Sequence, residues 1–394
     1  MYRRVTLALL VGLLTACSDD PVQPPVTPEP PTPPPAFERY AMVDAGGDHT
    51  CAVDLEGRLY CWGLGSHGRL GNGASDSLAM TAQPVLSSSR FFEVAAGDGH
   101  VCGTAAGGAL FCWGLANQGQ VGNRSSNFET TPFQVREFPN TFVSVTAGYR
   151  HSCAIGEDLR PYCWGWNFYG QLGNNSEIGQ GVPVPVATSE LFATISAGTL
   201  HTCGLSMDGR AFCWGDGAAG QLGNGTNQRS AAPVPVNTPL RFAVISAGGR
   251  HTCALTLDGV AYCWGAASGG QLGHGELTAA TAPVAVTGSL RFISISAGEE
   301  HTCAVATGGV VHCWGHNNYG RLGRSTLPGA QPLPAPVESD VEFAMVSAGR
   351  LHTCGLARTG ALYCWGFGGF GQLGTGRALS QAVPTRVAEP PSSP

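Results

Sequence analysis

The sequence contains no lysine, because all 21 of its basic residues are arginine. This absence excludes a phosphate-binding loop built on lysine and Schiff-base chemistry. Charged residues of both signs make up only 12% of the chain, and the net charge is -6. Such a balance gives no general attraction to a phosphate backbone, so we expect no nucleic-acid partner.

Long apolar runs are also absent, since no stretch reaches the 18 residues that a membrane-spanning helix needs. The chain is instead rich in the residues of tight turns, with 57 glycines and 27 prolines among its 394 residues. This composition favours many short strands joined by turns. We therefore predict an all-β protein.

One stretch recurs along nearly the whole chain, with its fifth copy reading His251-Thr-Cys-Ala-Leu-Thr-Leu-Asp-Gly-Val-Ala-Tyr-Cys-Trp-Gly265. The seven copies begin at His49, His100, His151, His201, His251, His301 and His352. A period of 50 or 51 residues indicates a propeller, a solenoid or an array. Because the runs around each cysteine are apolar on both alternating faces, each small sheet is expected to lie between two others, as a propeller blade does.

Each copy holds two cysteines ten residues apart, on either side of a short loop that contains glycine. The Asp258-Gly259 pair between two β-rich runs predicts a hairpin, which places the two cysteines opposite one another. Neighbours on paired strands can form a disulfide. The predicted pairs are Cys51 with Cys61, Cys102 with Cys112, Cys153 with Cys163, Cys203 with Cys213, Cys253 with Cys263, Cys303 with Cys313 and Cys354 with Cys364.

The repeated histidine allows two other interpretations. A metal site made of the histidine and the two thiols has the wrong cysteine spacing and lacks a fourth ligand, so we expect no metal. Seven equivalent histidines could also line a functional ring, but we favour a buried hydrogen-bonding role for them. The tryptophan that follows each second cysteine needs a partner for its indole N–H.

The sequence resembles the regulator of chromosome condensation repeat family, whose blades carry Ala-Gly-x-x-His-[Thr/Ser] and Trp-Gly-x-x-x-x-Gly-Gln-Leu-Gly. The resemblance covers residues 37 to about 388, and the second motif has Arg69 and Arg321 in place of Gln and Val121 in place of Leu. It implies a seven-bladed β-propeller, with short antiparallel blades of three to four strands and a Thr or Ser after every repeated histidine. It implies little about activity, because a shared fold hosts unrelated functions.

Residues 1–17 have a basic start, an apolar run from Val5 to Leu14 and small residues before Cys17. This pattern is typical of an export signal. Because it ends in Leu14-Thr15-Ala16-Cys17, it resembles a bacterial lipoprotein signal, which implies lipid on Cys17 and an outer-membrane location, on the periplasmic side or the cell surface. Export also makes the disulfides expected. Residues 18–36 are mostly proline and predict an extended linker.

The binding residues are predicted from strand alternation. In an antiparallel meander, the turn before each histidine and the loop after each Trp-Gly lie on one face, and the Asp-Gly hairpins lie on the other. Aromatic, arginine and amide side chains on the first face are typical of protein interfaces. The predicted partner-binding residues are Tyr149, Arg150, Trp166, Asn167, Phe168, Tyr169, His316, Asn317, Asn318, Tyr319, Phe367 and Phe370. Some of these rings could instead fold inward over the blade edges.

The sequence thus predicts four segments: a signal peptide (1–17), a linker (18–36), a propeller (37–388) and a tail (389–394). We expect a monomer that binds a protein or another macromolecule, has no catalytic residues and no cofactor, and meets a membrane only through its lipid. The alternative is an enzyme or a carbohydrate-binding module that uses the central channel. Converging titratable side chains in one pocket would favour the alternative.

Overall fold

Seven four-stranded antiparallel sheets follow one another in a computed structural model, which describes residues 40–125, 127–136, 141–325 and 329–388. Contacts divide the chain into Met1–Pro34 and Pro35–Pro394, and every described residue belongs to the second unit. The predicted signal peptide, the linker, Cys17 and the tail 389–394 lie outside the described residues. No helix in the described part of the chain has the length and apolar character of a membrane span.

Each blade is formed by consecutive strands of one repeat. Blade by blade, the strands are β1 (Tyr40–Ala45), β2 (His49–Asp54), β3 (Leu59–Leu64) and β4 (Leu78–Pro84); β5 (Phe91–Ala96), β6 (His100–Ala105), β7 (Ala109–Leu115) and β8 (Phe128–Gln134); β9 (Phe142–Ala147), β10 (His151–Gly156), β11 (Pro161–Gly165) and β12 (Gln180–Pro185); β13 (Phe192–Ala197), β14 (His201–Ser206), β15 (Ala211–Gly215) and β16 (Ser230–Pro235); β17 (Phe242–Ala247), β18 (His251–Thr256), β19 (Ala261–Gly265) and β20 (Ala280–Ala285); β21 (Phe292–Ala297), β22 (His301–Ala306), β23 (Val311–His316) and β24 (Ala330–Pro336); β25 (Phe343–Ala348), β26 (His352–Ala357), β27 (Leu362–Gly366) and β28 (Gln381–Arg386). Three short 3₁₀ helices are also described: η1 (Ser66–Gly68), η2 (Ala106–Gly108) and η3 (Asn318–Gly320).

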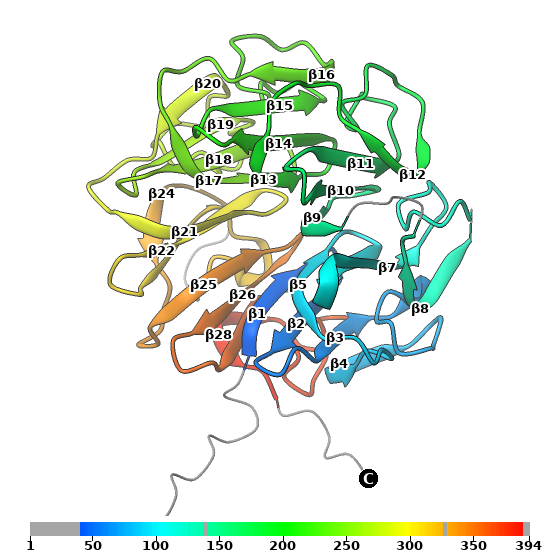
Figure 1. Ribbon diagram of the computed structural model, residues 1–394. Helices are drawn as coiled ribbons and strands as arrows, with labels where there is room; N and C mark the ends of the chain where they lie inside the picture. The colour runs from blue at the N-terminus through cyan, green and yellow to red at the C-terminus, as the bar shows by residue number, and fades with distance from the viewer. Residues whose placement is uncertain (1–39, 126, 137–140, 326–328, 389–394) are drawn as a thin grey trace, which may run out of the picture. The chain divides into compact units, whose positions relative to one another are not determined.

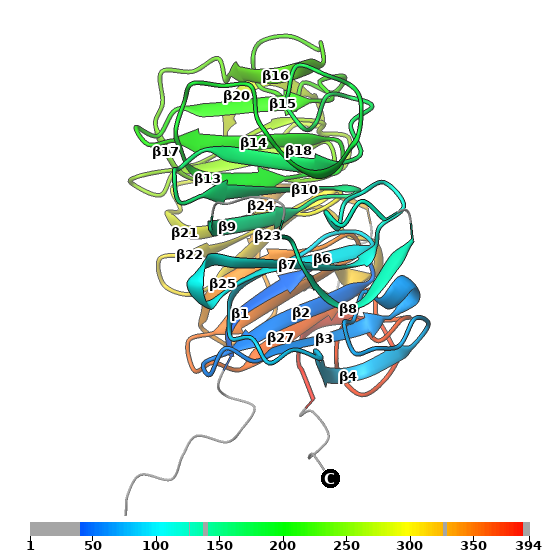
Figure 2. The same cartoon turned by 45° about the vertical axis from the view of Figure 1, so that its right-hand side comes forward.

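The seven blades form a ring, so the fold is a seven-bladed β-propeller, as the sequence predicts. Figures 1 and 2 show the blue first blade beside the orange and red seventh blade. The first strand of each blade is innermost and lies beside the first strands of its neighbours, including β1 beside β25. No blade borrows a strand from another among the described residues. The ring is therefore closed by side-chain and loop contacts between blades 1 and 7.

The two cysteines of each repeat are register partners on the second and third strands, as Cys253 and Cys263 are on β18 and β19. All seven predicted disulfides are present, with Cα atoms 4.0 to 4.1 Å apart. This short separation belongs to the close, non-hydrogen-bonded type of antiparallel pair. The disulfide prediction is confirmed. Every one of these sulfur-bearing residues is fully buried.

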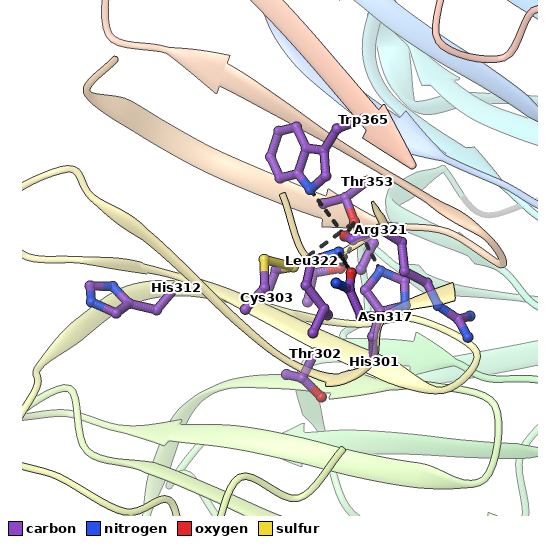
Figure 3. The surroundings of a disulfide bond; sticks show 12 residues. His301, Thr302, Cys303, His312, Asn317, Arg321, Leu322, Thr353 and Trp365 are labelled. Atoms are coloured by element: carbon purple, nitrogen blue, oxygen red, sulfur yellow. Dashed lines mark hydrogen bonds between the residues drawn. A yellow bond between two sulfur atoms is a disulfide. The ribbon is translucent and has the colours of Figure 1, made fainter. Parts of the chain in front are cut away.

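A blade-bridging hub joins neighbouring blades. It consists of the repeated His and the Gln or Arg carbonyl of one blade, together with the Thr or Ser and the Trp of the next. Figure 3 shows the hub between blades 6 and 7, where Nε2 of His301 lies 2.9 Å from Thr353 Oγ1. The Thr353 hydroxyl and the Trp365 indole both donate to the carbonyl of Arg321, at 2.9 and 3.0 Å. The hydrogen-bonding interpretation of the histidines is confirmed.

The hub also fixes the state of the histidine. Because the Thr353 hydroxyl donates its only hydrogen to Arg321, it must accept from Nε2 of His301, which therefore carries the ring proton. The same arrangement recurs at six of the seven blade interfaces, including the closing one, where His352 contacts Thr50 at 2.8 Å. These imidazoles are neutral and fully buried.

The second repeat departs from the motif, because Val101 stands where the others have Thr or Ser. The expectation of a hydroxyl in every copy is therefore wrong. His49 in the first blade is fully buried, and neither of its ring nitrogens has a hydrogen-bond partner. Of the hub's hydrogen bonds, the interface between blades 1 and 2 keeps only that of the indole, from Trp113 to the carbonyl of Arg69 at 3.1 Å.

We predict that Val101→Thr stabilises the protein by about 1 kcal/mol, because the new hydroxyl accepts from His49 and donates to Arg69. The matched control is Thr252→Val, which removes the same hydroxyl from an intact hub and should cost about 1 to 3 kcal/mol. Urea unfolding of both variants measures the two shifts. A destabilised Val101→Thr variant would show that the interface cannot accommodate the hub.

A second ring of hydrogen bonds lines the channel. The backbone N–H near the end of each first strand donates to a side-chain oxygen of the preceding blade, as Ala297 does to Ser246 at 2.9 Å. Blade 2 has Ala95 at this position, and Glu93 replaces the missing hydroxyl by accepting from Val145 at 2.9 Å. In blade 1 the carboxylate of Asp44 is the acceptor, and the N–H of Ala96 donates to it at 2.7 Å. Burial raises the pKa of Asp44 to about 6 and that of Glu93 to about 7.

Candidate functional site

The two faces of the propeller follow from strand pairing. His251 pairs with Gly265, so the turn before β18 and the loop after β19 lie at the same end of the blade. Gly265 has a φ of +106°, and a Cβ there would lie 2.6 Å from the carbonyl oxygen of Arg250. This glycine therefore allows the loop to leave the strand beside the turn. We call this end of the seven blades the His face, and the opposite end, with the Asp-Gly type hairpins, the hairpin face.

The mouth of the central channel opens on the His face. It is lined by the Ala-Gly pairs and by the residue that follows each pair, namely Gly47, Asp98, Tyr149, Thr199, Gly249, Glu299 and Arg350. The cavity has a volume of about 100 Å³. Sites for small-molecule ligands are usually about 300 to 1,000 Å³. The channel mouth is therefore small for a sugar ring or an enzyme substrate.

Charged side chains reach across this mouth. Arg350 forms ion pairs with Asp48 of blade 1 and, at 3.9 Å, with Asp98 of blade 2. Glu299 of blade 6 accepts a hydrogen bond of 3.1 Å from Thr199 of blade 4. Burial raises the pKa of both the Asp98 and the Glu299 carboxyl groups, although nearby arginines lower that of Asp98. These contacts cover the channel opening with fixed polar groups.

Tyr149 and Arg150, the first predicted binding residues, lie at the rim of the mouth and are half-buried. The guanidinium carbon of Arg150 lies 5.0 Å from the centroid of the Tyr149 ring. This contact is a cation–π pair, which orders both side chains.

The loop after β11 carries an aromatic cluster. Trp166 and Phe168 are stacked, with ring centroids 6.3 Å apart and an interplanar angle of 11°. Tyr169 packs edge-on against both, at 5.7 and 5.1 Å. Phe168 is 57% exposed, whereas Trp166 and Tyr169 are half-buried. The cluster therefore presents one exposed ring supported by two others.

A second aromatic cluster joins blades 6 and 7. The ring of Phe367 lies 4.9 Å from that of Tyr319 and 5.6 Å from that of Phe370. Tyr319 is 54% exposed and has a φ of +61°. A non-glycine residue in this left-handed region is strained, and such strain often marks a functional position. Of the neighbouring predicted residues, Asn318 is exposed and His316 is half-buried.

Two predicted binding residues are wrong. Asn167 is fully buried, and its amide donates to the carbonyls of Ser176 and Ile178 while its oxygen accepts from the N–H of Leu172. Asn317 is 5% exposed and accepts from the N–H of Leu322 at 3.0 Å. Both amides hold their own loop together, because a buried amide must satisfy its donors and acceptors locally. Neither is available to a partner.

An apolar residue that the sequence pattern did not single out recurs at the start of the fourth strand or in the loop just before it. Four copies expose a large aliphatic side chain there: Leu78 (49%), Ile178 (72%), Leu277 (51%) and Leu379 (55%). Leu78 pairs directly with Leu64, the residue after Trp-Gly, so these side chains lie on the His face. Their spacing of about two repeats could have revealed them, but the loop around them varies in sequence.

The described part of the chain offers little for chemistry. No group of three or more His, Cys, Asp or Glu side chains gathers there as metal ligands would. Fourteen cysteines are held in disulfides, and the repeated histidines are buried within the blades. Exposed aromatic and aliphatic side chains do occur on the His face, among them Phe168, Tyr319 and Ile178.

The described residues form a repeat propeller with exposed aromatic side chains on loops of the His face. The RCC1-like domain model matches residues 18–291 and 79–393, and the chain belongs to this family. The ultraviolet-B receptor UVR8 of Arabidopsis thaliana is 36% identical over 155 residues, which cover 38% of this chain and 35% of the receptor. A bifunctional kinase and ubiquitin ligase of Dictyostelium discoideum is 31% identical over 162 residues, but only 8% of its length is covered. The chain thus matches about a third or less of each of these relatives.

Solved structures of the family share the fold. Yeast RCC1 (Prp20) in complex with Kap60 matches with a TM-score of 0.76 and 23% identity, over 90% of this chain and 86% of that one. Human WBSCR16 matches with a TM-score of 0.77 and 19% identity, over 84% of this chain and 95% of that one. These likenesses show a common propeller.

Proposed function

We propose that this chain is an exported, lipid-anchored, monomeric propeller that binds a protein partner through the His face and catalyses no reaction itself. The observation that carries the proposal is the presence on that face of two aromatic clusters, one around Trp166 and Phe168 and one around Tyr319 and Phe367, together with exposed aliphatic residues. Aromatic side chains of this kind are the usual anchors of protein interfaces. The small channel mouth counts against the alternative of an enzyme or carbohydrate-binding module in the channel.

Similar proteins support the partner class. Two of the solved structures are described as yeast RCC1 bound to Kap60 and as Prp20p with binding properties to Gsp1p and histones. Those partners belong to those proteins. They support a protein as the class of partner.

The exported location has two supports. The first is the sequence of residues 1–17, which ends in Leu14-Thr15-Ala16-Cys17. The second is the set of seven buried disulfides, since disulfides form and persist in oxidising compartments.

The first strand, β1, begins on the hairpin face, where the N–H of Tyr40 donates to the carbonyl of Gly360 at 3.1 Å. The described chain therefore begins on the face opposite the His face.

We predict that Trp166→Ala weakens partner capture by about 2 kcal/mol or more, because it removes an aromatic anchor and the support of Phe168. The melting temperature should change little, since the cluster lies in a surface loop. The measurement is quantitative capture from envelope extracts, with the captured proteins identified by mass spectrometry. Leu55→Asp is the matched control, because Leu55 is 69% exposed on the hairpin face. Equal loss of capture in both variants, or none in either, would contradict the proposed face.

We predict that the cell-associated protein carries lipid on Cys17, and that Cys17→Ser either releases the protein or leaves an unprocessed precursor. The reason is that Cys17 is the one cysteine outside the seven disulfide pairs and follows the apolar run after two small residues, Thr15 and Ala16. Membrane fractionation and the mass of the N-terminal peptide measure the outcome. A Cys17→Ser protein that is cleaved normally and remains membrane-bound would exclude lipid anchoring at this residue.

A further inference from the structure

The hairpin face has an apolar patch of its own in blades 4 to 6. We define it as Leu191, Met207, Leu257 and Ile293, whose side chains are 40%, 58%, 86% and 49% exposed. Met207 and Leu257 occupy the same position in the hairpins of successive blades. Single exposed apolar residues are normal, but a cluster of several marks an interaction surface.

The patch is continuous. Met207 and Leu257 both line a groove of about 340 Å³ between blades 4 and 5, and Leu257 and Ile293 both line a groove of about 370 Å³ between blades 5 and 6. Leu191 lies next to Met207, whose N–H donates to the Leu191 carbonyl at 3.1 Å. Leu257 therefore forms a ridge between two shallow grooves. Side chains that project from turn tips in this way can insert a short distance into another surface, whereas they do not enclose a deep ligand pocket.

Two exposed arginines flank the ridge. Arg241 lines the first groove and Arg291 the second. The Nη1 atoms of both donate to nearby backbone carbonyls, and Arg291 lies 3.9 Å from the carboxylate of the exposed Asp258. Apolar side chains bordered by arginine are typical of protein segments that rest in the interface of a bilayer, where the guanidinium meets lipid phosphate.

The entry point of the chain lies on this same face, at Tyr40. Cys17 precedes Tyr40 by 23 positions (40 − 17). At the rise of about 3.1 Å per residue of an extended polyproline II chain, this length spans roughly 70 Å between Tyr40 and a lipid on Cys17. A lipid on Cys17 would therefore raise the local concentration of the propeller near the membrane.

We propose that the hairpin face of blades 4 to 6 rests on the surface of a phospholipid bilayer. Met207, Leu257 and Ile293 insert at headgroup depth, and Arg241 and Arg291 pair with lipid phosphates. This inference rests on the lipid anchoring in the proposed function. It gives the propeller an orientation, in which the His face and its aromatic clusters point away from the membrane.

The test uses the full acylated protein in vesicles of phosphatidylethanolamine and phosphatidylglycerol whose acyl chains carry bromine, which quenches indole fluorescence on contact. Leu257→Trp places an indole on the ridge, and Ile178→Trp places one on the His face at a site that is 72% exposed. Both positions are exposed, so both variants should fold, which their melting temperatures check. The expected result is loss of the added emission for Leu257→Trp and none for Ile178→Trp.

Three outcomes overturn the proposal. The first is equal emission of the Leu257→Trp variant in brominated and unbrominated vesicles. The second is quenching of the Ile178→Trp variant alone. The third is seen without lipid: if a rising protein concentration protects the Leu257→Trp indole from a water-soluble quencher, the patch binds a second copy of the chain. Failure of lipid anchoring is seen separately, as an unmodified Cys17 in the mass spectrum. In that case the vesicles are added to the unacylated protein, and the difference in quenching between Leu257→Trp and Ile178→Trp tests whether the hairpin face contacts the membrane.

Discussion

Reduction of all seven disulfides should prevent the protein from refolding. Each disulfide closes a loop of about ten residues, which contributes about 3 kcal/mol in the chain-entropy model. Seven equivalent loops amount to roughly 20 kcal/mol, more than the 5 to 15 kcal/mol that separates a typical folded domain from its unfolded state. Removal of a single pair by Cys253→Ala with Cys263→Ala should cost about 3 kcal/mol and leave the fold intact.

The measurement compares refolding after denaturation with and without a reductant, followed by circular dichroism and thiol counting. The control is the native protein in the same reductant, because its disulfides are fully buried and should resist reduction until the blades open. If the reduced chain regains the native spectrum, or if the native protein is reduced rapidly without unfolding, the disulfides are not the main constraint on the fold.

Acidification should unfold the protein steeply below about pH 6. Burial lowers the pKa of His100, His151, His201, His251 and His352 to about 3, and that of His49 and His301 well below the usual value. Because the folded pKa is depressed, the unfolded chain binds more protons between about pH 6.5 and 3, and stability falls as the pH falls through this window. Five such groups give about 7 kcal/mol per pH unit, at about 1.4 kcal/mol for each.

The two channel carboxyl groups change stability with pH in the opposite direction. The pKa values of Asp44 and Glu93 are raised to about 6 and about 7, so the folded state binds more protons than the unfolded state above about pH 4. Their effect is a loss of stability as the pH rises through that range to about 7. Two groups cannot offset five or more histidines, so the optimum should lie near neutral pH.

Urea unfolding at a series of pH values, with the disulfides intact, measures the slope. Glu93→Gln is the control: it keeps an acceptor for the N–H of Val145 but removes the titrating group, so it should raise stability at pH 8 and make the loss of stability between about pH 7 and pH 4.5 steeper. A free energy of unfolding that stays constant between pH 7 and pH 5 would mean that the folded state does not hold the buried histidines in the neutral form.

The repeat itself explains why so much of the fold could be predicted. Seven copies of Cys-x9-Cys around a hairpin turn fix the register of the second and third strands, and stacking then follows because each sheet is apolar on both faces. The exception at Val101 is instructive. The sequence shows the substitution, but only the packed interface shows that it leaves His49 without a partner.

The binding residues were harder to predict because the loop after Trp-Gly varies in both sequence and backbone. Position alone could not tell Asn167, whose amide turns inward to three neighbours, from Phe168, which is 57% exposed. Aromatic clustering between blades is also invisible in a single repeat. Tyr319 and Phe367 come from different blades and meet only because the ring brings their loops together.

The most direct test of the central claim is the footprint of the captured partner, measured by hydrogen–deuterium exchange of the bound and the free protein. The account predicts slower exchange in the His-face loops, around residues 166–178, 316–322 and 367–379, and unchanged exchange in the hairpins around residues 206–209 and 257–259. Protection confined to the hairpins, with the His-face loops unaffected, would contradict it.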